Sequence, residues 1–261
     1  MHRFDRRQML ISTGAAFTAA VLTPGHRASA ASAEIVEAKV ISHNPTLYHG
    51  WPTVTRRKKR ATFGRLFRCA RGSRLSVRPR GNDAIRRRRQ NMGLALCFDG
   101  LTWSWIARIP VRKGDDIKKY HELHAVETSK GTIVAQLRNH NKKSYRETIQ
   151  TESTDGGKTW SVPHSIGVFG YPSHLLRLRD DRLLMTFGHR RKPYGNQARV
   201  SEDHGRTWSE PMILSGDAIG ADMGYPSTVE LDDGTLLSVW YELMRGSKRA
   251  VLRQARWNLK G

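Results

Sequence analysis

Three similar stretches of the sequence carry a chemically capable side chain at the same position. The turn glycines Gly131 and Gly234 anchor the alignment of two of these stretches. On this anchor Glu122 falls opposite Tyr225, and the shared string GYPS places Tyr171 at the same position. A phenol has a pKa of about 10 and becomes a nucleophile only when a neighbouring base takes its proton. A carboxylate can be such a base if the repeated positions converge on one cavity.

The elements that must position these residues are repeated pairs of β-strands. Residues 120–137, 170–187 and 224–242 each show a β-rich run, a short turn and a second run of alternating or fully apolar residues. The earlier string HGWPT begins in the same way and puts Trp51 at the matching position. Units of about 50 residues with four short strands are typical of a β-propeller. The first strand of each blade then lines a central channel, where equivalent positions meet.

A turn motif repeats with the strands. The strings STDGGKTWS at 153–161 and SEDHGRTWS at 201–209 both fit S-x-D-x-G-x-x-W, with tryptophans 48 residues apart, and a poorer copy ends at Trp103. The aspartate would accept backbone N–H bonds across a tight turn, the glycine would take a positive φ, and the tryptophan would pack under the sheet. We therefore expect structural roles for Asp155, Gly157, Trp160, Asp203, Gly205 and Trp208.

The strand pairs and turns together resemble the sialidase family, whose blades carry this S-x-D-x-G-x-x-W turn, the Asp box. The resemblance is specific from about residue 118 to residue 257 and weak before it. It implies an all-β fold, a six-bladed β-propeller, of which about four blades are recognisable. Residues 34–261 amount to fewer than five units of 48 residues. We therefore expect one or more blades to be missing or unrecognisable.

The resemblance also implies catalytic roles. In sialidases a tyrosine attacks the sugar and a glutamate takes its proton, so Tyr225 is the implied nucleophile and Glu122 its base. A phenol approaches an acidic sugar more easily than a carboxylate, because it is neutral until its proton leaves. The implied activity is retaining hydrolysis of a terminal acidic sugar from a glycan substrate, without a cofactor.

His121 and His124 point to opposite faces of one strand, which argues against a metal site.

Arginines are implied to hold the carboxylate of the substrate, since a guanidinium fork suits bidentate contact. Arg138 matches one member of the family's arginine triad, and Arg190 or Arg191 could be another. Glu242 corresponds to the acid that steadies the remaining arginine. Each residue taken singly could have a structural role, but their common spacing favours a site. The predicted substrate-binding residues are Arg138, Arg190, Arg191, Glu242, Tyr171 and Trp51.

Two parts of the family pattern are missing. Sialidases carry the first triad arginine in an R-I-P string, where this chain has Gly50-Trp51-Pro52. The acid/base aspartate should lie in or just after the first blade, where only Asp83 is available by position. Incomplete propellers also leave an unpaired blade edge, so we expect little or no activity from this chain. The alternative class is a non-catalytic carbohydrate-binding propeller or an inactive remnant.

Positive charge is concentrated in one block. Lysines and arginines number 45 against 23 acids, a net charge of +22, and residues 56–91 hold 13 arginines and two lysines against one acid. A nucleic-acid surface would need interleaved aromatics that this block lacks. A disordered insert is an alternative, because like charges repel. We favour translation out of frame, since a GC-rich gene read one base off yields arginine in excess, and we expect no nucleic-acid partner.

The N-terminus has the pattern of an export signal. Residues 1–33 combine a basic head, an apolar stretch and small residues around Ala28-Ser29-Ala30. Arg6-Arg7 followed by Gln8-Met9-Leu10 resembles the twin-arginine type. We expect cleavage and a periplasmic or secreted monomer formed by residues 34–261. No run of 18 apolar residues exists, so no membrane span is predicted.

Overall fold

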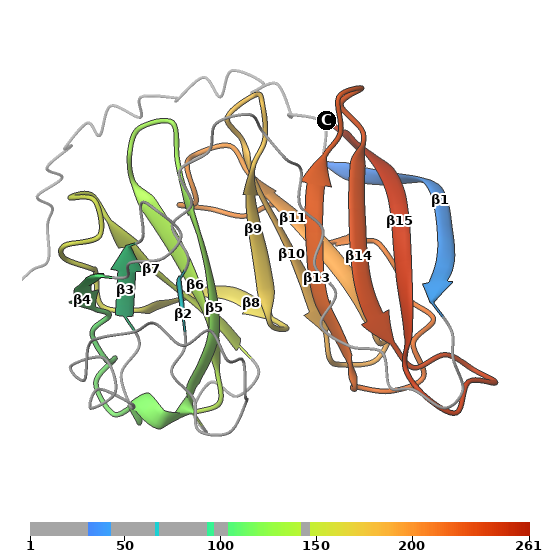
Figure 1. The fold of residues 1–261 in the computed structure, drawn as a ribbon, viewed down its shortest axis with the longest axis horizontal. Coiled ribbons are helices and arrows are strands. Elements are labelled where there is room, and N and C mark those ends of the chain that lie inside the picture. The colour runs from blue at the N-terminus through green and yellow to red at the C-terminus, as the bar shows by residue number, and fades with distance from the viewer. Residues whose placement is uncertain (1–30, 43–65, 68–92, 97–103, 142–146) are drawn as a thin grey trace, which may run out of the picture.

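The computed structural model describes residues 31–42, 66–67, 93–96, 104–141 and 147–261. Over these residues the chain forms antiparallel strands and one short 3₁₀ helix, η1 (Ile117–Lys119). The strands make four sheets that stand side by side in an open row (Figure 1). The described residues include no helix long and apolar enough to cross a membrane.

Each sheet is small and antiparallel, and its strands pair in chain order except where β1 joins the fourth sheet. The first contains β2 (Leu66–Phe67), β3 (Gly93–Leu96) and β4 (Ser104–Arg108). The second contains β5 (Tyr120–Glu127), β6 (Ile133–Asn139), β7 (Glu147–Ser153) and β8 (His164–Phe169). The third contains β9 (Ser173–Arg177), β10 (Leu183–His189), β11 (Gly195–Ser201) and β12 (Met212–Ile213). The fourth contains β13 (Met223–Glu230), β14 (Leu236–Glu242), β15 (Val251–Lys260) and β1 (Ser32–Ser42).

The fourth sheet joins distant parts of the chain. Strand β1 pairs antiparallel with β15 at the outer edge of this sheet, with Ser32 opposite Lys260 (Figure 1). The first described strand therefore completes the last sheet. Because β1 already begins at Ser32, the boundary expected between residues 33 and 34 falls inside this strand.

The first strands of the second, third and fourth sheets are neighbours. Strand β5 contacts β9, and β9 contacts β13. The strand pairs predicted at 120–137, 170–187 and 224–242 are β5–β6, β9–β10 and β13–β14. Each sheet corresponds to one blade, and the first strands β5, β9 and β13 are neighbours. The prediction of an all-β propeller with about four recognisable blades is therefore confirmed.

Apolar side chains fill the spaces between neighbouring blades. Trp240 and Trp257, both fully buried, pack with Leu184 between the third and fourth sheets. Phe187 belongs to the cluster between the second and third sheets, and Trp160 to the cluster on the other side of the second sheet. Burial of such side chains, worth about 1.5–3 kcal/mol each, holds the sheets together.

The two Asp-box turns have the same internal hydrogen bonds. Ser153 Oγ donates to Asp155 Oδ1 at 2.8 Å and accepts from Gly157 N at 2.9 Å, and Asp155 Oδ1 accepts from Thr159 N at 2.9 Å. Gly157 has a φ of +86°. Hydrogen bonds from Thr159 lower the pKa of Asp155 to about 2. Asp203 makes the equivalent bonds in the second copy, so both aspartates close turns.

The second Asp-box turn is also bonded to the preceding blade. Gln150 of β7 donates from Nε2 to the Gly205 carbonyl at 2.7 Å, and its Oε1 accepts from Trp208 Nε1 at 3.1 Å. The same Oε1 accepts from Gln136 Nε2 at 3.1 Å. Gln150 and Gln136 are fully buried. A single amide therefore satisfies polar groups from two blades, and we call this arrangement the Gln150 latch.

Replacing Gln150 by leucine should lower the free energy of unfolding by about 2–4 kcal/mol, because buried groups of Trp208, Gly205 and Gln136 would lose a partner. Urea denaturation of the purified variants measures this change. Gln254→Leu, at a half-buried glutamine of β15, is the matched control and should change stability much less. Equal stability of the two variants would show that the Gln150 latch contributes nothing.

Two histidines face each other between β5 and β9. The ring centroids of His124 and His174 lie 4.3 Å apart, and His124 Nδ1 accepts from Leu175 N at 3.1 Å. Burial lowers the pKa of His124 to about 4. Burial, with a smaller contribution from His124, also places the pKa of His174 well below 6.5. Both rings are therefore neutral at neutral pH.

The stability of the fold should fall as the pH is lowered from about 6.5 towards 4. In this window the unfolded histidines bind protons and the folded ones do not, so stability present above the unfolded pKa is lost below it. Melting temperatures measured from pH 7.5 to pH 4.5 test this. His124→Gln combined with His174→Asn should weaken the dependence, whereas the surface variant His164→Gln should retain it. An unchanged slope in the double variant would contradict the assignment.

Candidate active site

Tyr225 departs from the regular ladder of β13. Its φ of +51° lies in the left-handed region, at a cost of about 1–3 kcal/mol for a residue other than glycine. The pairing of β13 with β14 shifts register between Gly224 and Ser227. Gly224 lies so close to Gly188 of β10 that a Cβ on Gly188 would stand 3.0 Å from the Gly224 Cα. The local backbone therefore directs the Tyr225 side chain away from the regular strand pattern.

Glu122 occupies a similar irregularity in β5, where the pairing with β6 shifts register between Tyr120 and Leu123. The Tyr225 hydroxyl donates to Glu122 Oε1 at 2.8 Å. Arg138 Nη1 donates to the Tyr225 hydroxyl at 2.9 Å and to Glu122 Oε2 at 3.3 Å. A phenol, a carboxylate and a guanidinium group are thus within hydrogen-bonding distance of one another.

The environment of Glu122 favours its ionised form. Burial raises the pKa of Glu122, but the charge of Arg138 and hydrogen bonds, including the one from Tyr225, lower it by more, so the pKa lies below 4.5. The carboxylate is therefore charged at neutral pH and can accept a proton from the phenol. Arg138 would stabilise the phenolate that this transfer forms.

Arg138 is held by two further contacts. Its Nε donates to His140 Nε2 at 2.7 Å, and its guanidinium carbon lies 4.3 Å from the ring centroid of Tyr171. The His140 ring stacks on His121 with centroids 4.2 Å apart. Burial, followed by the charge of Arg138, lowers the pKa of His140 to about 4. The neutral imidazole is thus an acceptor that fixes the orientation of the arginine.

Arg190 joins this cluster, whereas Arg191 does not. Arg190 Nε donates to the Tyr171 carbonyl at 3.1 Å, and its guanidinium carbon lies 6.0 Å from the ring centroid of Tyr225. Arg191 instead lies over the ring of Phe169, at 4.1 Å from the centroid. Of the two alternatives in the sequence, Arg190 is the one near the phenol.

Glu242 lies outside the cluster and pairs with an arginine that the sequence analysis did not select. The fully buried carboxylate accepts from Arg253 of β15 and from Ser215 Oγ. Arg253 also donates to Asp217 at 2.6 Å. Burial raises the pKa of Glu242, against the opposing charge of Arg253. Buried and half-buried residues alternate along β15, and Arg253 is one of the buried residues. This alternation is the sequence pattern that could have identified Arg253 as an inward-facing arginine.

Other sequence-derived expectations fall outside the described residues. They concern the N-terminal segment up to residue 30, Trp51, Asp83 and the basic segment 56–91 except for the two residues of β2. The sequence analysis missed His140, because nothing but its place two residues after Arg138 marks it. Within the described part of the chain, no three His, Cys, Asp or Glu residues are arranged to hold a metal ion.

Comparisons with known proteins identify relatives of this fold. Residues 82–237 match the family model of the BNR repeat-like domain. A protein of unknown function from Dyadobacter fermentans is 30% identical, with a TM-score of 0.57, over 65% of this chain and 46% of that one. An endo-arabinase from Bacteroides thetaiotaomicron is 16% identical, with a TM-score of 0.50, over 66% of this chain and 72% of that one. The intramolecular trans-sialidase from Ruminococcus gnavus is 19% identical, with a TM-score of 0.48, over 64% and 38%.

These matches differ in what they support. A search of curated proteins found no match. The match to the Dyadobacter protein spans less than half the length of that protein. The likeness to the endo-arabinase is a likeness of fold alone. The family model covers more than half of the chain, including both Asp-box turns and the strands that carry Glu122 and Tyr225. The chain therefore belongs to the BNR repeat-like family and has its sialidase-like β-propeller fold.

Proposed function

We propose that the protein is a retaining glycoside hydrolase of the sialidase type that releases a terminal acidic sugar from a glycan. Glu122 takes the phenolic proton while the Tyr225 oxygen bonds to the anomeric carbon and the glycosidic bond breaks. Water then attacks the glycosyl-tyrosine, and Glu122 returns its proton to the departing Tyr225 oxygen. The proton that the water loses replaces the one given to the leaving group in the first step. The observation that carries this proposal is the 2.8 Å hydrogen bond from the Tyr225 hydroxyl to Glu122.

The charges beside the phenol favour an acidic sugar. Arg138 and Arg190 bring two guanidinium groups to the Tyr225 ring, beside the carboxylate of Glu122. A guanidinium group binds a carboxylate strongly and in a defined geometry. A neutral pentose has no carboxylate for these guanidinium groups to bind. We therefore favour a sugar acid over arabinose, although an arabinanase shares the fold.

The departing oxygen of a natural glycan needs a proton from an acid. Asp83, the candidate by position, lies outside the described residues. An aryl sialoside largely removes this requirement, because its phenol leaves readily as an anion. The retaining step also leaves a covalent sugar on the tyrosine, so a slow enzyme can be tested by trapping that intermediate.

Tyr225→Phe should reduce turnover of a fluorogenic aryl sialoside by a factor of about 10³ or more, because the nucleophile is lost. A difluorinated sialic acid inactivator should add one sugar to the peptide containing Tyr225, as detected by mass spectrometry. The matched control Tyr120→Phe, whose hydroxyl bonds to Asp115, should keep both the turnover and the labelling of the Tyr225 peptide, whereas Tyr225→Phe should lose both. Binding of sialic acid without turnover or labelling would identify a non-catalytic carbohydrate-binding propeller and overturn the enzyme proposal.

His140→Ala should raise the KM for the aryl sialoside about three- to tenfold, with a smaller change in kcat. The substitution removes the acceptor of Arg138 Nε, so the arginine would no longer be oriented for the carboxylate. His140→Gln keeps an acceptor and should restore much of the KM. A loss of activity that glutamine does not rescue would show that the imidazole serves only to stabilise the fold.

A further inference from the structure

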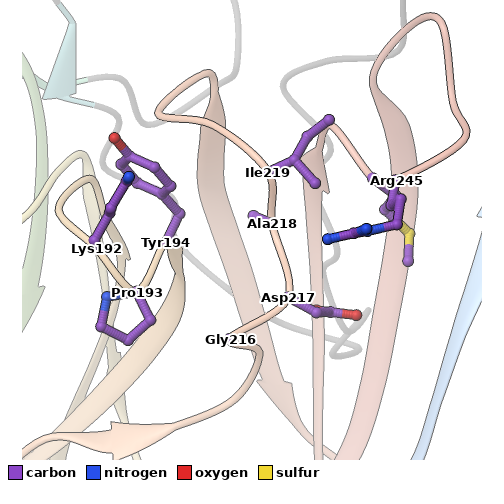
Figure 2. A pocket seen from close by; sticks show the side chains of 9 residues that line it. Lys192, Pro193, Tyr194, Gly216, Asp217, Ala218, Ile219 and Arg245 are labelled. Carbon is purple, nitrogen blue, oxygen red and sulfur yellow. The ribbon is translucent and has the colours of Figure 1, made fainter.

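A trough opens beside the candidate active site and takes no part in the chemistry proposed above. Its volume is about 840 Å³, within the range of roughly 300–1,000 Å³ that is usual for small-ligand sites. Figure 2 shows Lys192 and Tyr194 on one side and Arg245 on the other, with Ala218 and Ile219 on the segment between them. The loop at Asp217 forms the floor between them. The trough is therefore built from three separate loops of the third and fourth blades.

Both walls of the trough follow closely in the chain after residues at the candidate active site. Lys192 follows Arg190 by two residues in the β10–β11 loop. On the opposite wall, Arg245 follows the end of β14, where the Tyr241 ring packs on Tyr225 with centroids 5.9 Å apart. The segments that carry Arg190 and Tyr241 therefore lead from the candidate active site to the two walls of the trough.

The lining of the trough is basic and includes one aromatic ring. Lys192 and Arg245 are exposed cations on opposite walls. Asp217 is the acid of the lining and accepts from Arg253 at 2.6 Å, the arginine that also pairs with Glu242. Tyr194 adds a half-buried ring with an apolar face and a polar tip. This combination suits a sugar ring that carries a carboxylate.

We propose that the trough binds the sugar next to the terminal one, and that this second sugar is itself acidic. The inference rests on the proposed function, because an enzyme that removes a terminal sugar must leave the rest of the glycan beside Tyr225. Lys192 and Arg245 pair with the second carboxylate, and Tyr194 contacts the face of the ring. The substrate class is then a glycan that ends in two consecutive acidic sugars.

Calorimetric titration of the full-length Tyr225→Phe variant tests this without turnover. The probes are free sialic acid, α2,8-linked disialic acid and sialyllactose, in which the second sugar is neutral. We expect disialic acid to bind about tenfold more tightly than the other two, as two exposed ion pairs allow. Adding Lys192→Ala and Arg245→Ala should abolish this gain and leave the affinity for sialic acid unchanged.

A matched control removes the same charge elsewhere. Lys130→Ala with Arg206→Ala alters two exposed turns at the other end of the blades and should leave all three affinities unchanged. If sialic acid binds but disialic acid gains nothing, or the gain survives in the trough variant, the trough proposal is wrong and the active-site proposal stands. If sialic acid does not bind, the active-site proposal fails. Binding of disialic acid that the trough variant abolishes would then still support the trough, and absence of that binding would overturn it.

Discussion

Burial of apolar side chains between neighbouring sheets is the interaction on which the rest of this structure depends. Trp240 and Trp257 fill one such space, and Phe187 and Trp160 belong to the clusters on either side of the second sheet. This packing sets β5, β9 and β13 next to one another. Only then can Tyr225 and Glu122, which are 103 residues apart in the sequence, share a hydrogen bond. Apolar packing alone does not fix how one blade is oriented on the next, whereas the hydrogen bonds of the Gln150 latch have a defined geometry.

The candidate active site is organised around one guanidinium group. Arg138 bonds to the phenol, the carboxylate and the imidazole, and it lies over the Tyr171 ring. Its charge lowers the pKa of Glu122 against the effect of burial, and burial together with this charge lowers the pKa of His140. Arg138 therefore lowers the pKa of the base Glu122 and would stabilise the phenolate of Tyr225, while its own contacts fix its orientation. Placing these side chains together requires an unfavourable local backbone, namely the left-handed conformation of Tyr225 and the register shifts of β5 and β13.

Positively charged side chains occur both at the candidate site and in the trough, and their positions follow from the fold. Arg190 and Lys192 belong to one loop between β10 and β11, so a single segment contributes to both places. A glycan with consecutive acidic groups would satisfy both. The match to the Dyadobacter protein spans less than half the length of that protein, so the activity of a whole propeller of this kind remains our proposal.

The sequence by itself determined the strand pairs, the Asp-box turns and the equivalence of Glu122, Tyr171 and Tyr225, because alternation and turn residues are local patterns. The tertiary structure decided what depends on partners far along the chain. Strand β1 pairs with β15, and the arginine that pairs with Glu242 is Arg253. It also decided between the adjacent arginines at 190 and 191, whose side chains take different directions that no repeat pattern distinguishes. Local periodicity encodes which face a residue occupies, whereas the packing of one blade on another decides what that face meets.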